Sequence, residues 1–152
     1  MRFSNKRVFI TGASRGIGAE IASHFRTQGA FVIGTRTSSG SALEGICDEW
    51  FDADFTDETQ IAECSEYLKG QSIDILINNA GINTNAGFAE IDLDGFKQIQ
   101  QVNLLAPFML CQASIEWMKF NSWGRIVNIS SIWGKISKDG RAAYSASKFA
   151  LD

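Results

Sequence analysis

A tyrosine and a lysine stand four residues apart near the end of the sequence, in the segment YSASK that contains Tyr144 and Lys148. On a helix this spacing places both side chains on one face, one turn apart. A free tyrosine has a pKa of about 10 and is poorly matched to proton transfer at neutral pH, whereas a neighbouring cation favours the phenolate form. The pair is therefore a candidate for acid–base chemistry, and an ordinary amphipathic surface pair is the alternative.

A glycine-rich segment, TGASRGIG, runs from Thr11 to Gly18 directly after the first apolar run. Gly12 permits a sharp turn, Gly16 lets the backbone approach a pyrophosphate, and Gly18 lets a helix pack closely on a strand. The free N–H groups at the start of the following helix then face the anion. The segment predicts a dinucleotide phosphate loop. Its spacing G-x-x-x-G-x-G differs from the commoner G-x-G-x-x-G, and a purely structural turn is the alternative.

The end of the second apolar run indicates which dinucleotide is bound. Sites for NAD usually offer a carboxylate at this point, which accepts a hydrogen bond from the ribose 2′-hydroxyl. Here the run ends in GTRTS, residues 34–38, without a carboxylate. Arg36, together with Arg15 of the glycine-rich segment, could instead pair with a 2′-phosphate. The two arginines favour NADP(H), and two solvated surface side chains are the alternative.

Short apolar runs alternate with longer helical patterns along the whole chain. This alternation predicts a parallel sheet covered on both faces, that is, a doubly wound, Rossmann-like α/β fold in a single domain of residues 1–152. Ligands of such folds bind at the carboxyl ends of the strands, where all the motifs fall. The last helical pattern still runs at the final residue, so we expect the C-terminal strands of the sheet to be missing. The expected strands cover residues 8–11, 31–34, 49–54, 73–77 and 125–129, and the expected helices cover residues 17–28, 57–69, 94–102, 104–121 and 141–152.

The composition narrows the class of protein. The chain has 152 residues, 45% of them hydrophobic and 20% charged, with a net charge of -3, which argues against non-specific nucleic-acid binding. No apolar run has the length needed to cross a bilayer, and no signal peptide precedes the first strand, so we expect a cytoplasmic protein without a membrane partner. The spacing of Cys47, Cys64 and Cys111 fits neither a disulfide framework nor a zinc motif, and His24 is expected to face solvent. We therefore expect reduced thiols and no metal.

With the polar residues at the other strand ends included, the chain resembles the short-chain dehydrogenase/reductase family, in particular its single-domain branch with 3-oxoacyl-reductase-like members. The resemblance covers residues 8–152, and its motifs follow the order of the family. Together they are far more specific than any one of them alone. The matches are T-G-x-x-x-G-x-G at Thr11 to Gly18, N-N-A-G at Asn78 to Gly81, a helix asparagine at Asn103, N-x-S-S at Asn128 to Ser131 and Y-x-x-x-K at Tyr144 to Lys148.

The resemblance implies an oxidoreductase that transfers hydride between the nicotinamide of NADP(H) and a small carbonyl or secondary alcohol substrate. Tyr144 would exchange the proton of the substrate oxygen, and Lys148 would favour the phenolate and bind the nicotinamide ribose. Ser131, rather than Ser130, would hold the carbonyl oxygen near Tyr144. Asn103 would hold a water molecule of a proton relay, and a helix-breaking asparagine bonded to the backbone is the alternative.

The resemblance also assigns residues to the cofactor. Asp54, just after the third expected strand, would bind the adenine ring, and an N-cap or turn residue is the alternative. The turn of Asn79, Ala80 and Gly81 would pack beside the adenosine ribose, where small residues allow a close approach. The expected cofactor-binding residues are Gly12, Ser14, Arg15, Gly16, Ile17, Gly18, Thr35, Arg36, Asp54, Asn79, Ala80, Gly81, Tyr144 and Lys148.

Relatives are expected to continue past the last helix with two further strands, a segment that touches the nicotinamide and a mobile lid over the substrate. A truncated, non-catalytic nucleotide-binding or interaction module is therefore an alternative function. A sugar-nucleotide epimerase or dehydratase can share Y-x-x-x-K, but the glycine spacing and the segment Asn78 to Gly81 disfavour it. The sequence does not predict which substrate is bound. Trp133, Asn83 and Phe88 are expected to contribute part of the substrate-binding surface.

The segment 104–120 is apolar on more than one face, which is typical of a helix buried on several sides. The resemblance implies that this helix and the tyrosine-bearing helix pair across subunit interfaces. We therefore expect a homodimer or a homotetramer.

Overall fold

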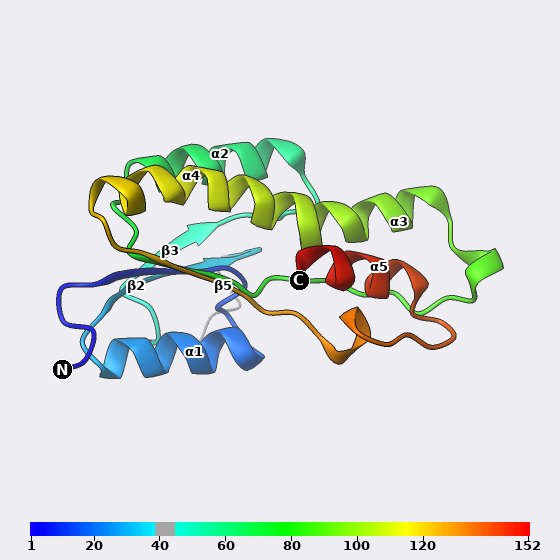
Figure 1. Ribbon diagram of the computed structural model, residues 1–152, viewed down its shortest axis with the longest axis horizontal. Helices are drawn as coiled ribbons and strands as arrows, with labels where there is room; N and C mark the ends of the chain where they lie inside the picture. Colours follow the sequence, from blue (N-terminus) through cyan, green and yellow to red (C-terminus); the bar gives the residue numbers. More distant parts are fainter. Residues whose placement is uncertain (39–44) are drawn as a thin grey trace.

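The structure is a computed structural model that describes residues 1–38 and 45–152. Five strands form one sheet in the order β3-β2-β1-β4-β5, and every neighbouring pair is parallel (Figure 1). All carboxyl ends therefore lie at the same edge of the sheet. The strands are β1 (Arg7–Ile10), β2 (Phe31–Arg36), β3 (Glu49–Asp52), β4 (Ile75–Asn78) and β5 (Arg125–Asn128).

Helices cover both faces of the sheet, as the alternating pattern predicts. Figure 1 shows α1 on one face and α2 and α4 side by side on the other. The arrangement confirms the doubly wound, Rossmann-like α/β fold. The helices are α1 (Gly16–Thr27), α2 (Glu58–Lys69), α3 (Leu93–Gln100), a π-helical segment η2 (Gln101–Leu105), α4 (Ala106–Phe120) and α5 (Ala142–Leu151), with short 3-10 helices η1 (Phe88–Glu90) and η3 (Ile132–Gly134).

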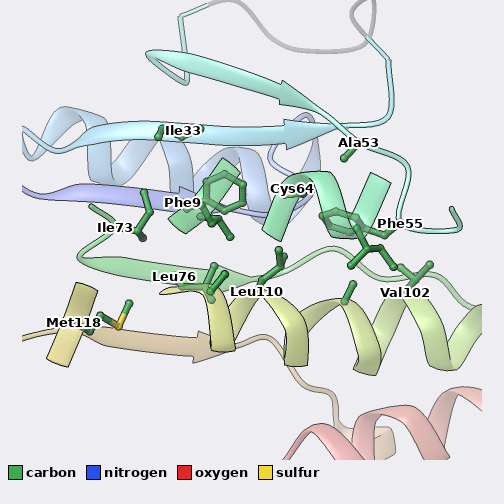
Figure 2. Packing of buried hydrophobic residues seen from close by; sticks show 14 residues of the cluster. Phe9, Ile33, Ala53, Phe55, Cys64, Ile73, Leu76, Val102, Leu110 and Met118 are labelled. Carbon is green, nitrogen blue, oxygen red and sulfur yellow. The ribbon is translucent and has the colours of Figure 1, made fainter. Parts of the chain in front are cut away.

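The central strands are buried on both faces, which explains why they read as continuous apolar runs. Val8, Phe9 and Ile10 of β1 have no exposed surface. Successive side chains point to opposite faces, so Phe9 joins the core beneath α2 and α4, shown in Figure 2, whereas Val8 and Ile10 join the core beneath α1. The two cores fix the sheet from both sides and so hold its carboxyl edge in place.

Apolar surface remains exposed along α4 and at the sheet edge. Phe108, Ile115 and Phe120 of α4 are 58%, 40% and 82% exposed, and all four residues of β5 are exposed. Leu110 of α4, in contrast, has no exposed surface and packs in the core. The expectation that this helix is buried on several sides is wrong for the single chain, which covers only one of its apolar faces.

The helix that carries Asn103 differs from the expected pair of helices. The backbone stays helical from α3 to α4 and widens to a π-helix at Gln101–Leu105 instead of breaking at Asn103. Pro107 gives a physical reason. It has no N–H to donate to the carbonyl four residues earlier, and its ring crowds that carbonyl, so a wider turn relieves the clash. The proline therefore sits in the first turn of α4, within a continuous helical segment.

Large apolar residues cover only part of the buried face of α1. Ile21 and Phe25 pack against the core beneath α1, but Ile17 is 63% exposed. The buried face is made instead by small residues, Gly18, Ala19 and Ala22, which bring the helix close to the strands. Ile17 stands at the carboxyl edge of the sheet, above the core rather than in it. His24 is exposed, as expected.

The three cysteines are free thiols. Burial raises the pKa of Cys47 and of Cys64 to about 12, with the Asp48 carboxylate adding to the shift at Cys47, and burial also raises the pKa of Cys111. Because the thiolate is the reactive form, we expect the folded chain to react with an alkylating reagent at pH 8 at least about tenfold more slowly than the unfolded chain. Mass spectrometry of the labelled chain, with and without urea, measures this ratio. Equal rates would contradict the burial of the thiols.

Within residues 1–38 and 45–152, none of the helices combines the length and the apolar character that crossing a membrane requires.

Candidate active site

The ends of β1 and β4 are tied together at the centre of the carboxyl edge. The Thr11 hydroxyl accepts hydrogen bonds from the backbone N–H groups of Asn79 and Ala80, each at 2.9 Å. The Asn79 side chain donates in return to the carbonyls of Thr11 and Gly12, at 2.9 and 3.0 Å. The strand order reverses between these two strands, which is where ligands bind in open α/β sheets.

The glycine-rich loop has the conformation that its sequence predicts. Gly12 and Gly16 adopt positive φ angles of 64° and 56°, which side chains disfavour. A Cβ on Gly18 would lie 2.2 Å from the carbonyl oxygen of Gly12, so only glycine allows the helix to start so close to the strand. The buried Thr35 hydroxyl accepts a 2.9 Å bond from the Gly12 N–H and fixes the loop against β2. The start of α1 is therefore held ready for an anion.

A cavity of about 420 Å³ opens at this edge, between the glycine-rich loop and the ends of β2, β3 and β4. Eleven of the expected cofactor-binding residues line it, and Gly18, Tyr144 and Lys148 do not. Six further lining residues were missed by the sequence interpretation, although their position just after strands β2, β3 and β4 or on the adjoining helix could have indicated them. These are Thr37, Ala53, Phe55, Thr56, Ile82 and Val102.

Arg36 lines the cavity and is held by two neighbours. Its Nε donates a 2.6 Å hydrogen bond to Oδ1 of Asp52, and its guanidinium carbon lies 5.1 Å from the ring centre of Trp50. The strand β2 itself ends without a carboxylate, as its sequence indicates, but the neighbouring strand β3 supplies one. The parallel register pairs Arg36 with Asp52 and brings an acid from β3 to the same place. Arg15, also lining the cavity, is exposed.

Asp54 has a turn-forming role in the structure. Its Oδ1 accepts bonds from the backbone N–H and the hydroxyl of Thr56, at 2.9 and 2.8 Å. This geometry matches the turn residue that the sequence left open as an alternative. Asp54 also lines the cavity, and its expected contact with an adenine ring stays a prediction.

Asn103 is completely buried and holds the turn after β4. Its Oδ1 accepts a 2.9 Å bond from the N–H of Ile82, and its Nδ2 donates 3.0 Å bonds to the Ile82 carbonyl and to the Ser147 hydroxyl. The side chain thus forms the backbone hydrogen bonds of the structural alternative. Ser147, whose hydroxyl also donates to the Tyr144 carbonyl at 2.7 Å, was missed as a connector to α5. Only its place within YSASK pointed to it.

Lys148 lies on α5, is only 4% exposed, and reaches the same turn. Its Nζ donates a 2.8 Å bond to the carbonyl of Ile129 and lies 5.7 Å from the ring centre of Tyr144. A Cβ on Gly81 would lie 3.6 Å from this Nζ and 3.3 Å from Oδ1 of Asn103. Burial lowers the pKa of Lys148, and the Asp152 carboxylate opposes that shift. Gly81 therefore lies against both Asn103 and Lys148, and the Tyr144 ring lies near the Lys148 ammonium.

The two serines after β5 take different positions. The Ser130 hydroxyl donates a 3.3 Å bond to the carbonyl of Lys148, whereas the Ser131 hydroxyl caps η3 by accepting a 3.2 Å bond from the N–H of Trp133. The segment after Ser131 packs directly on α5, since a Cβ on Gly134 would lie 2.9 Å from the Lys148 carbonyl oxygen. The 3-10 helix η3 that Ser131 caps therefore packs on the tyrosine-bearing helix, and Ser130 is hydrogen-bonded to the backbone of that helix.

Other expected residues lie at the periphery. Trp133 is partly buried, with the Lys138 ammonium 5.3 Å and the Arg141 guanidinium 5.8 Å from its ring centre. Phe88 is 82% exposed, and Asn83 bonds Asn85 on an exposed loop. Among the described residues, no group of three or more histidine, cysteine, aspartate or glutamate side chains is arranged to hold a metal ion.

Two curated relatives resemble most of the chain. The chain is 38% identical to the uncharacterized oxidoreductase YxjF of Bacillus subtilis (strain 168), over 93% of the chain and 59% of the relative. It is 35% identical to the 3-oxoacyl-(acyl-carrier-protein) reductase FabG of Escherichia coli (strain K12), over 99% of the chain and 65% of the relative. The chain thus spans less than two thirds of the length of these relatives.

Solved structures agree with this resemblance. A blue fluorescent protein from a metagenomic library, in complex with NADPH, is 30% identical and superposes with a TM-score of 0.85, over 99% of the chain and 66% of that structure. A 4-hydroxyisoleucine dehydrogenase complexed with NADH is 33% identical with a TM-score of 0.87, over 97% and 65%. The family profile described as short chain dehydrogenase matches residues 6–152. The ordered motifs, the sheet and the site agree with it, and the chain belongs to the short-chain dehydrogenase/reductase family of oxidoreductases.

Proposed function

We propose that the chain carries the dinucleotide-binding and proton-transferring parts of an NADP(H)-dependent oxidoreductase for a carbonyl or secondary alcohol. The position of Gly81 carries the proposal. This residue lines the cavity and also lies against Asn103 and Lys148. A dinucleotide that extends from the glycine-rich loop through the cavity would therefore bring its other end beside Lys148 and Tyr144. Hydride transfer is the chemistry that a bound nicotinamide supplies at that point.

The adenosine end favours a phosphorylated ribose. The start of α1 and the glycine-rich loop offer backbone N–H groups to the pyrophosphate. Arg36 and Arg15 line the cavity and can pair with a 2′-phosphate. The solved relatives include one complex with NADPH and one with NADH, so membership of the family does not choose between them. The choice of NADP(H) rests on the two arginines of this chain.

At the reacting end, each residue of the chain has a separate task. Tyr144 donates a proton to the carbonyl oxygen during reduction and removes it during oxidation. The Lys148 ammonium, one turn away, favours the phenolate and is also placed to bind the nicotinamide ribose. Ser131 holds the substrate oxygen near Tyr144 and stabilises developing charge. Asn103 fixes the turn at Ile82 and the helix at Ser147, and so keeps the site aligned.

The direct test is a titration of the purified chain with NADPH and NADH, followed by NADPH oxidation with a panel of ketones. Tight binding with turnover would support the whole proposal. Binding without turnover would favour a nucleotide-binding module of the same fold. A chain that binds neither dinucleotide would contradict the proposal.

Replacing Arg36 by glutamine is expected to weaken NADPH binding by about tenfold to a hundredfold, because a charged hydrogen bond to the 2′-phosphate is lost. NADH lacks this phosphate, so its affinity should change little. Isothermal titration of both dinucleotides measures the difference. Arg125→Gln is the matched control, since Arg125 begins β5 at the opposite edge of the sheet. Equal effects of Arg36→Gln on both dinucleotides would show that Arg36 does not recognise the 2′ position.

The exposed apolar residues favour assembly into a homodimer or homotetramer. Phe108, Ile115 and Phe120 of α4 and Phe149 of α5 are each between 40% and 82% exposed. Large apolar side chains exposed on these two helices favour a protein–protein interface. Sedimentation velocity over a range of concentrations tests this part of the proposal, and a monomer at every concentration would contradict it.

A further inference from the structure

Arg36 lines the cavity but is not an isolated cation, because the Asp52 carboxylate forms an ion pair with it. The ion pair between Nε of Arg36 and Oδ1 of Asp52 is 2.6 Å long. The pair arises from the register of β2 with β3, which sets the two residues side by side at the carboxyl ends of the strands. Asp52 itself is not among the residues that line the cavity, so it acts on a ligand through its charge and through its contact with Arg36.

The pair reduces the positive charge that Arg36 presents to a ligand. A carboxylate at hydrogen-bond distance offsets most of the field of one guanidinium at positions several ångströms away. The bond to Asp52 uses only one of the five N–H donors of the guanidinium, so the remaining donors can still bind a ribose hydroxyl or a phosphate. Recognition by hydrogen bonds is therefore retained, while the selective attraction of a phosphate dianion is weakened.

Asp52 is not needed to keep Arg36 in place. The Arg36 side chain is only 17% exposed, and its guanidinium is stacked on Trp50. Trp50 is in turn packed over Gly34, where a Cβ would lie 2.9 Å from the indole ring. Exposed ion pairs contribute little to the order of a side chain, and Asp52 is 49% exposed. The electrostatic effect of the carboxylate thus outweighs its effect on the position of Arg36.

We infer that Asp52 sets how strongly the site prefers 2′-phosphorylated over unphosphorylated adenosine ribose, by partly neutralising Arg36. The inference rests on the proposed dinucleotide function and assigns a specificity-determining residue within it. With Asp52 present, the site accepts NADPH and retains measurable affinity for NADH. Without the carboxylate, Arg36 acts as a full cation and the preference for NADPH increases.

The experiment measures the affinities of NADPH, NADH, adenosine 2′,5′-bisphosphate and AMP for the whole chain by isothermal titration. Asp52→Asn is expected to raise the ratio of NADPH to NADH affinity by about fivefold and to raise the ratio for the two adenosine phosphates similarly. Asp52→Glu restores the carboxylate and should keep the wild-type ratio. Added salt should reduce the difference between Asp52→Asn and wild type, because the effect is electrostatic.

Two further variants separate this inference from its alternatives. Glu116→Gln removes one negative charge from an exposed ion pair on α4, and should leave all four affinities unchanged. In an Arg36→Gln background, Asp52→Asn should raise the ratio by less than it does in the wild-type background, because the carboxylate then has no guanidinium for which to compete with the phosphate. An unchanged or lower ratio in Asp52→Asn, with wild-type binding intact, would overturn the inference alone. A wild-type chain that binds none of the four nucleotides would overturn the proposed function and this inference with it.

Discussion

Tyr144→Phe is expected to lower NADPH-dependent carbonyl reduction by about a hundredfold to ten-thousandfold, while the affinity for NADPH stays nearly unchanged. The range is that of a lost general acid. Phenylalanine keeps the ring of Tyr144 on α5 and removes only the hydroxyl, so the fold and the cavity should be retained. The pyrophosphate and adenosine contacts lie in the cavity, which Tyr144 does not line, so the loss of its hydroxyl should change dinucleotide affinity little.

The assay is steady-state NADPH oxidation with a responsive ketone, combined with a binding titration of the same preparation. Tyr67→Phe is the matched control, because Tyr67 is the other of the two tyrosines in the chain and lies on α2, hydrogen-bonded to Glu49. It should retain the wild-type rate. Activity retained in Tyr144→Phe would refute the proton-donor role. A wild-type chain that binds NADPH and reduces none of the ketones would refute turnover by this chain.

Much of the fold could be predicted because the signals are local. The strand β1 is a run of apolar residues that the sheet buries on both faces, and the glycines of the following loop fix its turn. The apolar runs of β2 and β4 likewise indicated where these strands end, and residues expected at those ends line the cavity. Wherever a motif stands at the carboxyl end of a strand, topology alone brings it to the site.

The parts that escaped prediction depend on contacts between segments distant in the sequence. The pairing of Arg36 with Asp52 follows from the register of two strands, which neither strand reveals alone. The bond between Asn103 and Ser147 links residues on separate helices, 44 positions apart. The exposure of Ile17 results from small residues taking the buried face of α1. In each case the local sequence pattern is compatible with several arrangements, and tertiary contacts determine which of them forms.

Asn103→Leu is expected to lower the free energy of unfolding by about 2 to 4 kcal/mol, since it leaves buried polar groups without partners. Asn103 is completely buried, and its side chain satisfies both the N–H and the carbonyl of Ile82. Leucine has a similar volume but offers no hydrogen bond. Because Ile82 and Gly81 line the cavity, NADPH binding should weaken together with stability.

Urea unfolding followed by circular dichroism measures the loss, and two variants show which bonds matter. Ser147→Ala removes the bond between Asn103 and α5 together with the bond from the Ser147 hydroxyl to the Tyr144 carbonyl, and should cost about 1 to 2 kcal/mol, the usual contribution of two hydrogen bonds. Asn85→Ala, on an exposed loop, should leave stability unchanged. If Asn103→Leu proved no less stable than Ser147→Ala, the two hydrogen bonds from Asn103 to the Ile82 backbone would not be the main contribution of the residue to stability. Asn103 would then matter through α5, and the alignment of Tyr144 and Lys148 would depend on the contact between the two helices rather than on the turn after β4.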